Sequence, residues 1–140
     1  MILSWPQFQY LLTAGVPAPA IVYPYLPETF TDAHGARWLH FPDDDVDWRP
    51  TTGELRGRWC LGEDAITDPD TYWNGDALRV YATPLEWMIA GRRRGVVIRD
   101  WSMVFDRLRD VPRVSVPAGL VAQYRKWMKP TRVPEMAVTA

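Results

Sequence analysis

The densest group of side chains able to do chemistry is a run of carboxylates in the first half of the chain. Alternating carboxylates in a loop suit a hard cation, but the calcium-binding hand also needs glycine at its sixth position and glutamate at its twelfth. Counted from Asp43, these positions hold Trp48 and Glu54, so the glycine is missing. The run is expected to be a solvated turn, with a cation site or a patch for a basic partner as alternatives. The candidate acidic partner-binding loop consists of Asp43, Asp44, Asp45, Asp47 and Trp48.

Basic side chains gather in the second half. One group follows a predicted helix end, where positive charge complements the helix dipole, and the other lies on the polar face of the last predicted helix. Either position explains the charges without a ligand. Arginine also suits phosphate and carboxylate groups, because its planar fork binds them with two hydrogen bonds. The candidate contacts to nucleic acid or to an acidic partner are Arg92, Arg93, Arg94, Arg125, Lys126 and Lys129.

The charge is unevenly distributed along the 140 residues, although the net charge is only −1. Residues 1–75 carry 4 basic and 11 acidic side chains, whereas residues 76–140 carry 12 basic and 6 acidic ones. Such asymmetry indicates either a nucleic-acid face or two halves that attract each other.

The sequence predicts no metal site, no intrachain disulfide and no membrane-spanning segment. His34, His40 and the single Cys60 make no zinc set and no intrachain disulfide, which suits a reducing cytoplasm. The apolar stretch over residues 11–26 is interrupted by three prolines and is too short to span a bilayer. We therefore expect a soluble cytoplasmic protein with no metal and no membrane partner.

Three short apolar runs determine the predicted architecture of the second half, because each is followed by a helix-like stretch. Strands joined by such helical crossovers pair in parallel. A capping box at Thr83–Glu86 and an N-cap at Asp100 mark two of the helix starts. The sequence predicts strands over 78–82, 95–99 and 113–116, and helices over 84–90, 101–110 and 118–128.

In open α/β sheets, ligands bind beyond the carboxyl ends of the strands. The crevice predicted there is lined by Thr83, Arg99, Asp100 and Trp101. It lacks the glycine-rich turn that a dinucleotide or a P-loop phosphate requires, so no cofactor is predicted. Asp100 is expected to be a helix cap rather than a catalyst.

The first half is predicted to be mainly antiparallel. Residues 7–14 read as a helix and residues 18–22 as a helical turn. Two hairpins follow, one pairing residues 29–31 with 37–41 and the other pairing 46–49 with 55–60. We expect an α/β protein with one domain: an N-terminal helix and proline-rich connector (1–28), hairpins (29–60), a loop (61–76), a parallel β/α unit (77–129) and a tail (130–140).

This order of elements resembles the topoisomerase–primase (toprim) fold of phage and plasmid replication proteins, over about residues 37–129. In those chains a hairpin-rich lead-in with an Arg-x-x-Leu-Gly-type segment precedes the first parallel strand, and residues 58–62 (Arg-Trp-Cys-Leu-Gly) have that place here. A working toprim site needs a glutamate after the first strand and an Asp-x-Asp pair after a later one, to hold Mg²⁺. Thr83 and the lone Asp100 stand at those strand ends, so the resemblance implies a non-catalytic relative.

The sequence leaves three functional hypotheses open. The first is a non-enzymatic binding protein of a phage or mobile element, which contacts nucleic acid or replication machinery through its basic half. The second is a protein-binding inhibitor or adaptor, for example an antagonist of a host defence complex, which uses the acidic loop and exposed aromatic side chains. Trp48, Tyr72 and Trp73 are the expected exposed aromatics. A metal-dependent phosphoryl-transfer enzyme is the third, and the missing carboxylates disfavour it.

Overall fold

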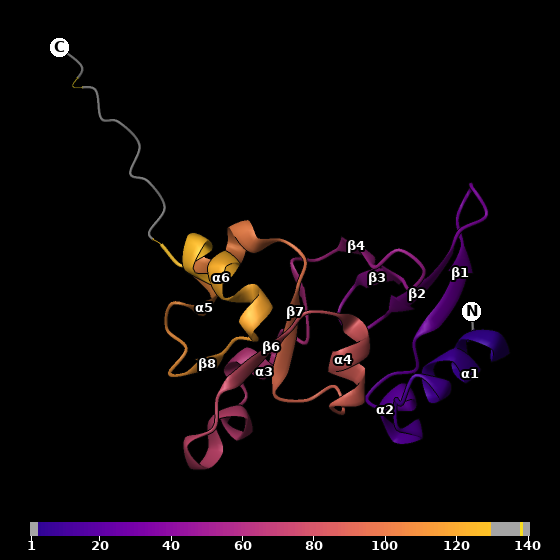
Figure 1. Ribbon diagram of the computed structural model, residues 1–140, viewed down its shortest axis with the longest axis horizontal. Helices are drawn as coiled ribbons and strands as arrows, with labels where there is room; N and C mark the ends of the chain where they lie inside the picture. Colours follow the sequence, from indigo (N-terminus) through magenta and orange to yellow (C-terminus); the bar gives the residue numbers. More distant parts are fainter. Residues whose placement is uncertain (1–2, 130–137, 139–140) are drawn as a thin grey trace.

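The computed structural model of the protein describes residues 3–129 and 138, and the rest of the expected tail over 130–140 lies outside the described residues (Figure 1). The chain is an α/β protein, as predicted, and the structure contains two four-stranded sheets. The first sheet is an antiparallel meander of β1 (Glu28–Thr31), β2 (Arg37–Phe41), β3 (Val46–Arg49) and β4 (Glu54–Gly57). It is preceded by α1 (Trp5–Thr13) and α2 (Ala18–Val22), which confirms both N-terminal helix predictions.

The second sheet has the strand order β5-β7-β6-β8. β6 pairs in parallel with both β7 and β8, which confirms the predicted parallel unit. Its strands are β5 (Cys60–Leu61), β6 (Leu78–Tyr81), β7 (Gly95–Ile98) and β8 (Val114–Ser115). Its helices are α4 (Pro84–Ile89), η2 (Trp101–Met103) with α5 (Val104–Leu108), and η3 (Ala118–Leu120) with α6 (Val121–Trp127).

Two predictions between residues 55 and 76 are wrong. The second hairpin ends at Gly57, where φ is +107° and Arg58 donates its backbone N–H to the carbonyl of Asp45. The chain leaves the first sheet there, and Cys60 pairs antiparallel with Ile98 in the second sheet. The expected loop over 61–76 contains the last residue of β5 and two short helices. Side-chain hydrogen bonds that composition alone does not reveal stabilise this segment: Asp68 caps the second helix, and the Thr71 hydroxyl donates to the carbonyl of Ala65 in the first. These helices are α3 (Asp64–Thr67) and η1 (Pro69–Gly75).

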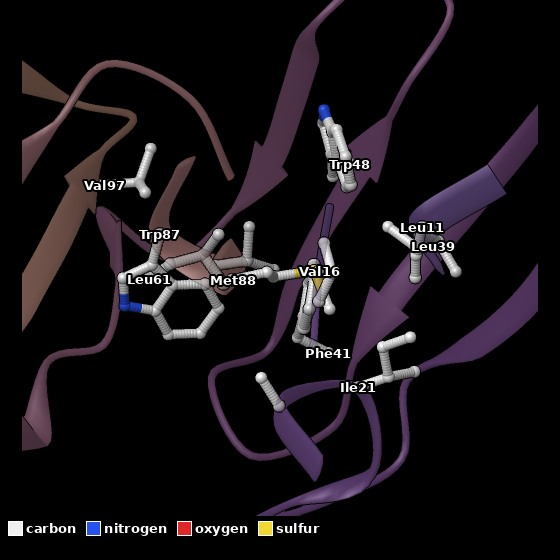
Figure 2. Packing of buried hydrophobic residues seen from close by; sticks show 12 residues of the cluster. Leu11, Val16, Ile21, Leu39, Phe41, Trp48, Leu61, Trp87, Met88 and Val97 are labelled. Carbon is white, nitrogen blue, oxygen red and sulfur yellow. The ribbon is translucent and has the colours of Figure 1, made fainter. Parts of the chain in front are cut away.

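Helix α4 lies between the two sheets and joins them in one hydrophobic cluster (Figure 1). Figure 2 shows Trp87 and Met88 of α4 between Val97 of the mixed sheet and Phe41 of the antiparallel sheet. The Phe41 and Trp87 rings meet edge to face, with their centroids 5.8 Å apart. Because both sheets contribute to this cluster, α4 is the element that holds them together.

A second cluster covers the opposite face of the mixed sheet. Successive side chains of a strand point to opposite faces, so Val97 faces α4 while Val96 faces α5. Val104 and Leu108 of α5 are buried there, and Trp127 of α6 packs against the same cluster. The two crossover helices α4 and α5 therefore lie on opposite faces of the sheet.

The expected exposed aromatics differ in their burial. Trp73 is 73 % exposed, as predicted. Trp48 is only 3 % exposed, so that prediction is wrong: β3 directs Trp48 to the same face as Val46, into the core. Tyr72 is half-buried and donates its hydroxyl to the carbonyl of Ile66. No helix among the described residues has the length and apolar character needed to cross a membrane.

Candidate functional site

A cavity of about 470 Å³ opens beside the turn that connects α4 to β7. Its walls come from the connector after α2, the turn between β2 and β3, the segment after β5, and the α4–β7 turn itself. We call it the Asp–Arg cavity, because its charged lining consists of Asp43, Asp44, Asp64, Asp68, Asp70 and residues 92–94.

The α4–β7 turn is built by a Schellman motif at the end of α4. Gly91, with φ of +93°, donates its N–H to the carbonyl of Met88, and Arg92 donates its own to the carbonyl of Trp87. The Trp87 indole then donates to the carbonyl of Gly95, over 3.1 Å, at the first residue of β7. These bonds fix where the three arginines leave the backbone.

Arg92 is buried, with 7 % of its surface exposed. Its Nη1 donates to the carbonyl of Tyr25 over 2.9 Å and to those of Ala20 and Ile21 over 3.4 Å. Its guanidinium also lies 5.3 Å from the Trp87 ring, whereas its Nε and Nη2 are buried without a partner. Burial lowers the pKa of Arg92, and the nearby Asp44 partly opposes that change. Arg92 therefore anchors the connector after α2 to the end of α4.

Arg93 and Arg94 are exposed and have different surroundings. The Arg93 guanidinium lies 5.6 Å from the centre of the Tyr23 ring. Arg94 pairs with Asp76, at 3.6 Å between Nη1 and Oδ2. Residues 92–94 thus divide into one buried anchor and two exposed side chains, rather than forming one basic patch.

The acidic side of the cavity comes from three separate segments. Asp43 and Asp44 lie in the β2–β3 turn, Asp64 begins α3, and Asp68 and Asp70 belong to the turn into η1. Among the described residues, none of these five carboxylates has an arginine, lysine or histidine nitrogen within 4 Å. The cavity therefore holds acidic charge that the described part of the fold does not pair.

Asp44 is the most constrained of these carboxylates. Its Oδ1 accepts the N–H of Gly62 over 2.9 Å, which ties the β2–β3 turn to the end of β5. Burial raises the pKa of Asp44, although the hydrogen bond from Gly62 lowers it. Asp43, Asp44 and Asp64 also line a second cavity, of about 350 Å³, together with Arg58 and Arg107. These three aspartates form the ridge between the two cavities.

The other members of the predicted acidic loop point elsewhere. Asp47 lies on the outer face of the antiparallel sheet, where its carboxylate is 2.7 Å from Nδ1 of His40. Asp45 is exposed at φ of +52°, and its carbonyl accepts the N–H of Arg58. Trp48 is in the core. Two residues of the five, Asp43 and Asp44, reach the cavity.

The predicted crevice at the carboxyl ends of β6 and β7 is occupied by local hydrogen bonds. Thr83 Oγ1 accepts the N–H of Glu86 over 3.2 Å at the start of α4, as predicted. Asp100 accepts the N–H and hydroxyl of Ser102, and these hydrogen bonds lower its pKa. Arg99 donates to the carbonyl of Arg58, and Trp101 is half-buried against α5's cluster. None of the four crevice residues lines either of the two cavities.

The second predicted basic group lies at the C-terminal end of α6, where Arg125 and Lys126 belong to the helix and Lys129 follows it. Arg125, Lys126 and Lys129 are exposed, and Nζ of Lys126 is 5.2 Å from the Trp127 ring. Because α6 packs on the opposite face of the mixed sheet from α4, this group is separated from residues 92–94 by the sheet. The six predicted basic contacts do not form one continuous surface.

Sequence reasoning missed part of the site. The sequence places Asp64, Asp68 and Asp70 in an expected loop and Tyr23 in the proline-rich connector, and it marks none of them as a site residue. Their signal was the density of aspartates after β5, but nothing in the sequence shows that this segment faces the acidic β2–β3 turn. Within the described residues, no group of three or more histidine, cysteine, aspartate or glutamate side chains is placed to hold a metal ion. Burial also raises the pKa of the Cys60 thiol, which makes it a poor nucleophile.

Comparisons with known proteins gave no match: no family model, no curated protein and no solved structure is similar to this chain. The geometry of the cavity is therefore the basis for a functional proposal.

Proposed function

We propose that this protein is a non-enzymatic binding protein that takes up a basic segment of a partner protein at the Asp–Arg cavity. The observation that carries the proposal is the convergence of five aspartates, from three segments, on one open cavity, where none has an ion-pair partner among the described residues. Five carboxylates outnumber the three arginines of the same lining, so the net charge of the cavity lining favours a cationic partner.

The three arginines at the cavity offset the charge of the five aspartates only in part. Arg92 lies near Asp44 but donates its hydrogen bonds to backbone carbonyls, and Arg94 pairs with Asp76 outside the acidic wall. Arg93 is exposed and lies over Tyr23. Nucleic-acid phosphates would meet net negative charge here, which favours a protein partner at this site.

The experiment uses fluorescence anisotropy with two synthetic peptides, one of Gln and Lys and one of Gln and Glu. We expect the Gln–Lys peptide to bind, to weaken with rising salt, and to bind at least about tenfold more weakly to the Asp64→Asn/Asp68→Asn variant. The matched control is Asp106→Asn/Asp110→Asn, which removes the same charge from α5 and the turn that follows it, away from the cavity. Equal weakening by both variants, or binding of the Gln–Glu peptide, would contradict the proposal.

Nucleic-acid binding is a second candidate function, supported by the exposed cations beside Trp127 on α6. Phosphate contacts release counterions, so such binding must fall steeply as salt rises. Gel shifts at low salt compare the wild type with an Arg125→Ala/Lys126→Ala/Lys129→Ala variant and with Arg93→Ala/Arg94→Ala. Binding lost only in the α6 variant supports this function, and no binding by the wild type rejects it.

The resemblance to the toprim fold supports a proposal for the class of partner. A toprim-like relative without metal ligands fits a phage or plasmid protein that binds replication machinery or a host defence complex. We therefore expect no intrinsic nuclease, topoisomerase or primase activity. Metal-dependent DNA cleavage or synthesis that Asp100→Asn abolishes would contradict this expectation.

A further inference from the structure

The segment after α2 presents a run of large apolar side chains to solvent. Val22 is 50 % exposed, Tyr23 59 %, Tyr25 55 % and Leu26 41 %. Pro24 lies within this run and is also exposed, and Pro27 ends the run. We call residues 22–26 the 22–26 surface. Contiguous exposed apolar side chains of this kind mark interaction sites rather than ordinary surface.

The backbone beneath this surface is held rigidly by Arg92. Its guanidinium donates to the carbonyl of Tyr25 within the segment and to those of Ala20 and Ile21 just before it. Burying a guanidinium with Nε and Nη2 unpartnered opposes folding. Although burying this charge is unfavourable, the hydrogen bonds from Arg92 hold a segment whose own side chains contribute little to the core. A surface that is already ordered loses less conformational entropy when a partner binds.

The 22–26 surface borders the Asp–Arg cavity. Tyr23 and Pro24 belong to both, and the Arg93 guanidinium covers the Tyr23 ring at 5.6 Å. Tyrosine and arginine at the rim of a cavity are the residue types that dominate binding energy in protein interfaces. An occupant that fills the acidic cavity must therefore pass beside exposed apolar rings.

We propose that the partner segment is amphipathic: its basic side chains enter the Asp–Arg cavity while its apolar side chains cover the 22–26 surface. This inference rests on the proposed function and specifies the chemistry of the partner. Charge complementarity argues for a basic partner rather than a second copy of this chain. A two-fold contact through this surface would bring the two sets of aspartates near each other.

Three labelled peptides separate the inference from the function on which it rests: Leu–Lys, Gln–Lys and Leu–Glu, each with the same length and pattern. We expect the Leu–Lys peptide to bind about tenfold more tightly than the Gln–Lys peptide, and the Leu–Glu peptide not to bind. Equal binding of the two lysine peptides overturns the inference and leaves the proposed function standing. Failure of both lysine peptides to bind overturns the proposed function itself, and tight binding of the Leu–Glu peptide overturns the role of the acidic charge.

The variant that locates the apolar contact is Val22→Ser/Tyr25→Ser, because both side chains are half exposed or more and neither lines the Asp–Arg cavity. It should remove the tenfold advantage of the Leu–Lys peptide and leave Gln–Lys binding unchanged. The control is Trp73→Ser, which removes a 73 % exposed ring outside the cavity lining. Loss of the advantage in the control instead overturns the inference, as does a concentration-dependent dimer in sedimentation that the Val22→Ser/Tyr25→Ser variant abolishes.

Discussion

Polar side chains at the two ends of the mixed sheet differ in the partners that they find within the fold. At the carboxyl ends of β6 and β7, Thr83 and Asp100 cap the helices that follow, and Arg99 bonds to the carbonyl of Arg58. At the amino end of β7, five aspartates share a cavity with no ion pair among the described residues. Of these five, Asp68 also caps a helix, because its Oδ1 accepts the N–H of Asp70 at the start of η1. The other four cap no helix, so the functional candidate lies at the end where most of the carboxylates remain free for a ligand.

Ligands of open α/β sheets generally bind beyond the carboxyl ends of the strands, where neighbouring strands lead to helices on opposite faces. This arrangement is present here. The crossover helices α4 and α5 lie on opposite faces, which creates a switch point between β6 and β7. The walls of the Asp–Arg cavity, however, come largely from outside the parallel unit: the α2 connector, the β2–β3 turn and the segment after β5. The open cavity therefore lies at the opposite end of the sheet, where segments from outside the parallel unit form its walls.

The largest expected effect concerns Trp87, the side chain that holds the amino end together. Trp87→Ala should lower the free energy of unfolding by about 3–5 kcal/mol, because it removes a fully packed indole and its bond to the carbonyl of Gly95. Urea denaturation followed by far-UV circular dichroism measures the loss. Trp101→Ala, at the carboxyl end, changes a half-buried indole and should cost less. An equal cost at both ends would contradict the central role of α4.

The next effect tests the buried arginine. Arg92→Met keeps much of the side-chain volume but removes the donor to three carbonyls, so we expect a loss of about 2 kcal/mol in the free energy of unfolding. Arg93→Met, at an exposed neighbour, should change it by less than about 0.5 kcal/mol. Urea denaturation midpoints compare the two variants. A stabilising Arg92→Met would mean that burial of the charge costs more than its hydrogen bonds contribute.

Local patterns made the parallel half of this fold predictable. The Thr83 cap, the stop at Gly91 and the apolar spacing of the helices all act within a few residues of each other, so they can be read from the sequence. The exchange between sheets at Gly57 could not be read in this way. Alternation of polar and apolar residues continues through that kink, although Cys60 pairs with a strand almost forty residues later.

The candidate site was predictable only in pieces. The acidic loop and residues 92–94 were each identified by composition, but their meeting at one cavity depends on α4 packing between the sheets. The same packing buries Arg92, which the sequence presents as one of three equivalent surface arginines. Long-range packing decides both outcomes, and no local pattern reports it.

A smaller effect is expected at the carboxyl end, where the comparison predicts a role in stability alone. Thr83→Ala removes the N-cap of α4 and should lower the free energy of unfolding by about 1 kcal/mol. Binding of the Leu–Lys peptide should be unchanged, since Thr83 does not line the cavity. Thr83→Ser, which keeps the hydroxyl, should restore the stability. Weakened peptide binding by a folded Thr83→Ala protein would show that the two ends are coupled.

The smallest effect is a difference in sign between two aspartates at low pH. Burial raises the pKa of Asp44 above its ordinary value of 3.8, so the folded protein binds its proton more tightly, and the stability contribution of Asp44 falls as pH rises through and above that value. Hydrogen bonds from Ser102 lower the pKa of Asp100, so its contribution is present above 3.8 and is lost as pH falls below it. Urea denaturation of Asp44→Asn and Asp100→Asn between about pH 3 and 6 tests both signs. Relative to the wild type, Asp44→Asn should gain stability as pH rises, while Asp100→Asn should lose it. If the stability of both variants changes with pH in the same direction, the fold stabilises the ionised form of Asp44 as it does that of Asp100. The two ends of the sheet would then not differ in their unpaired charge.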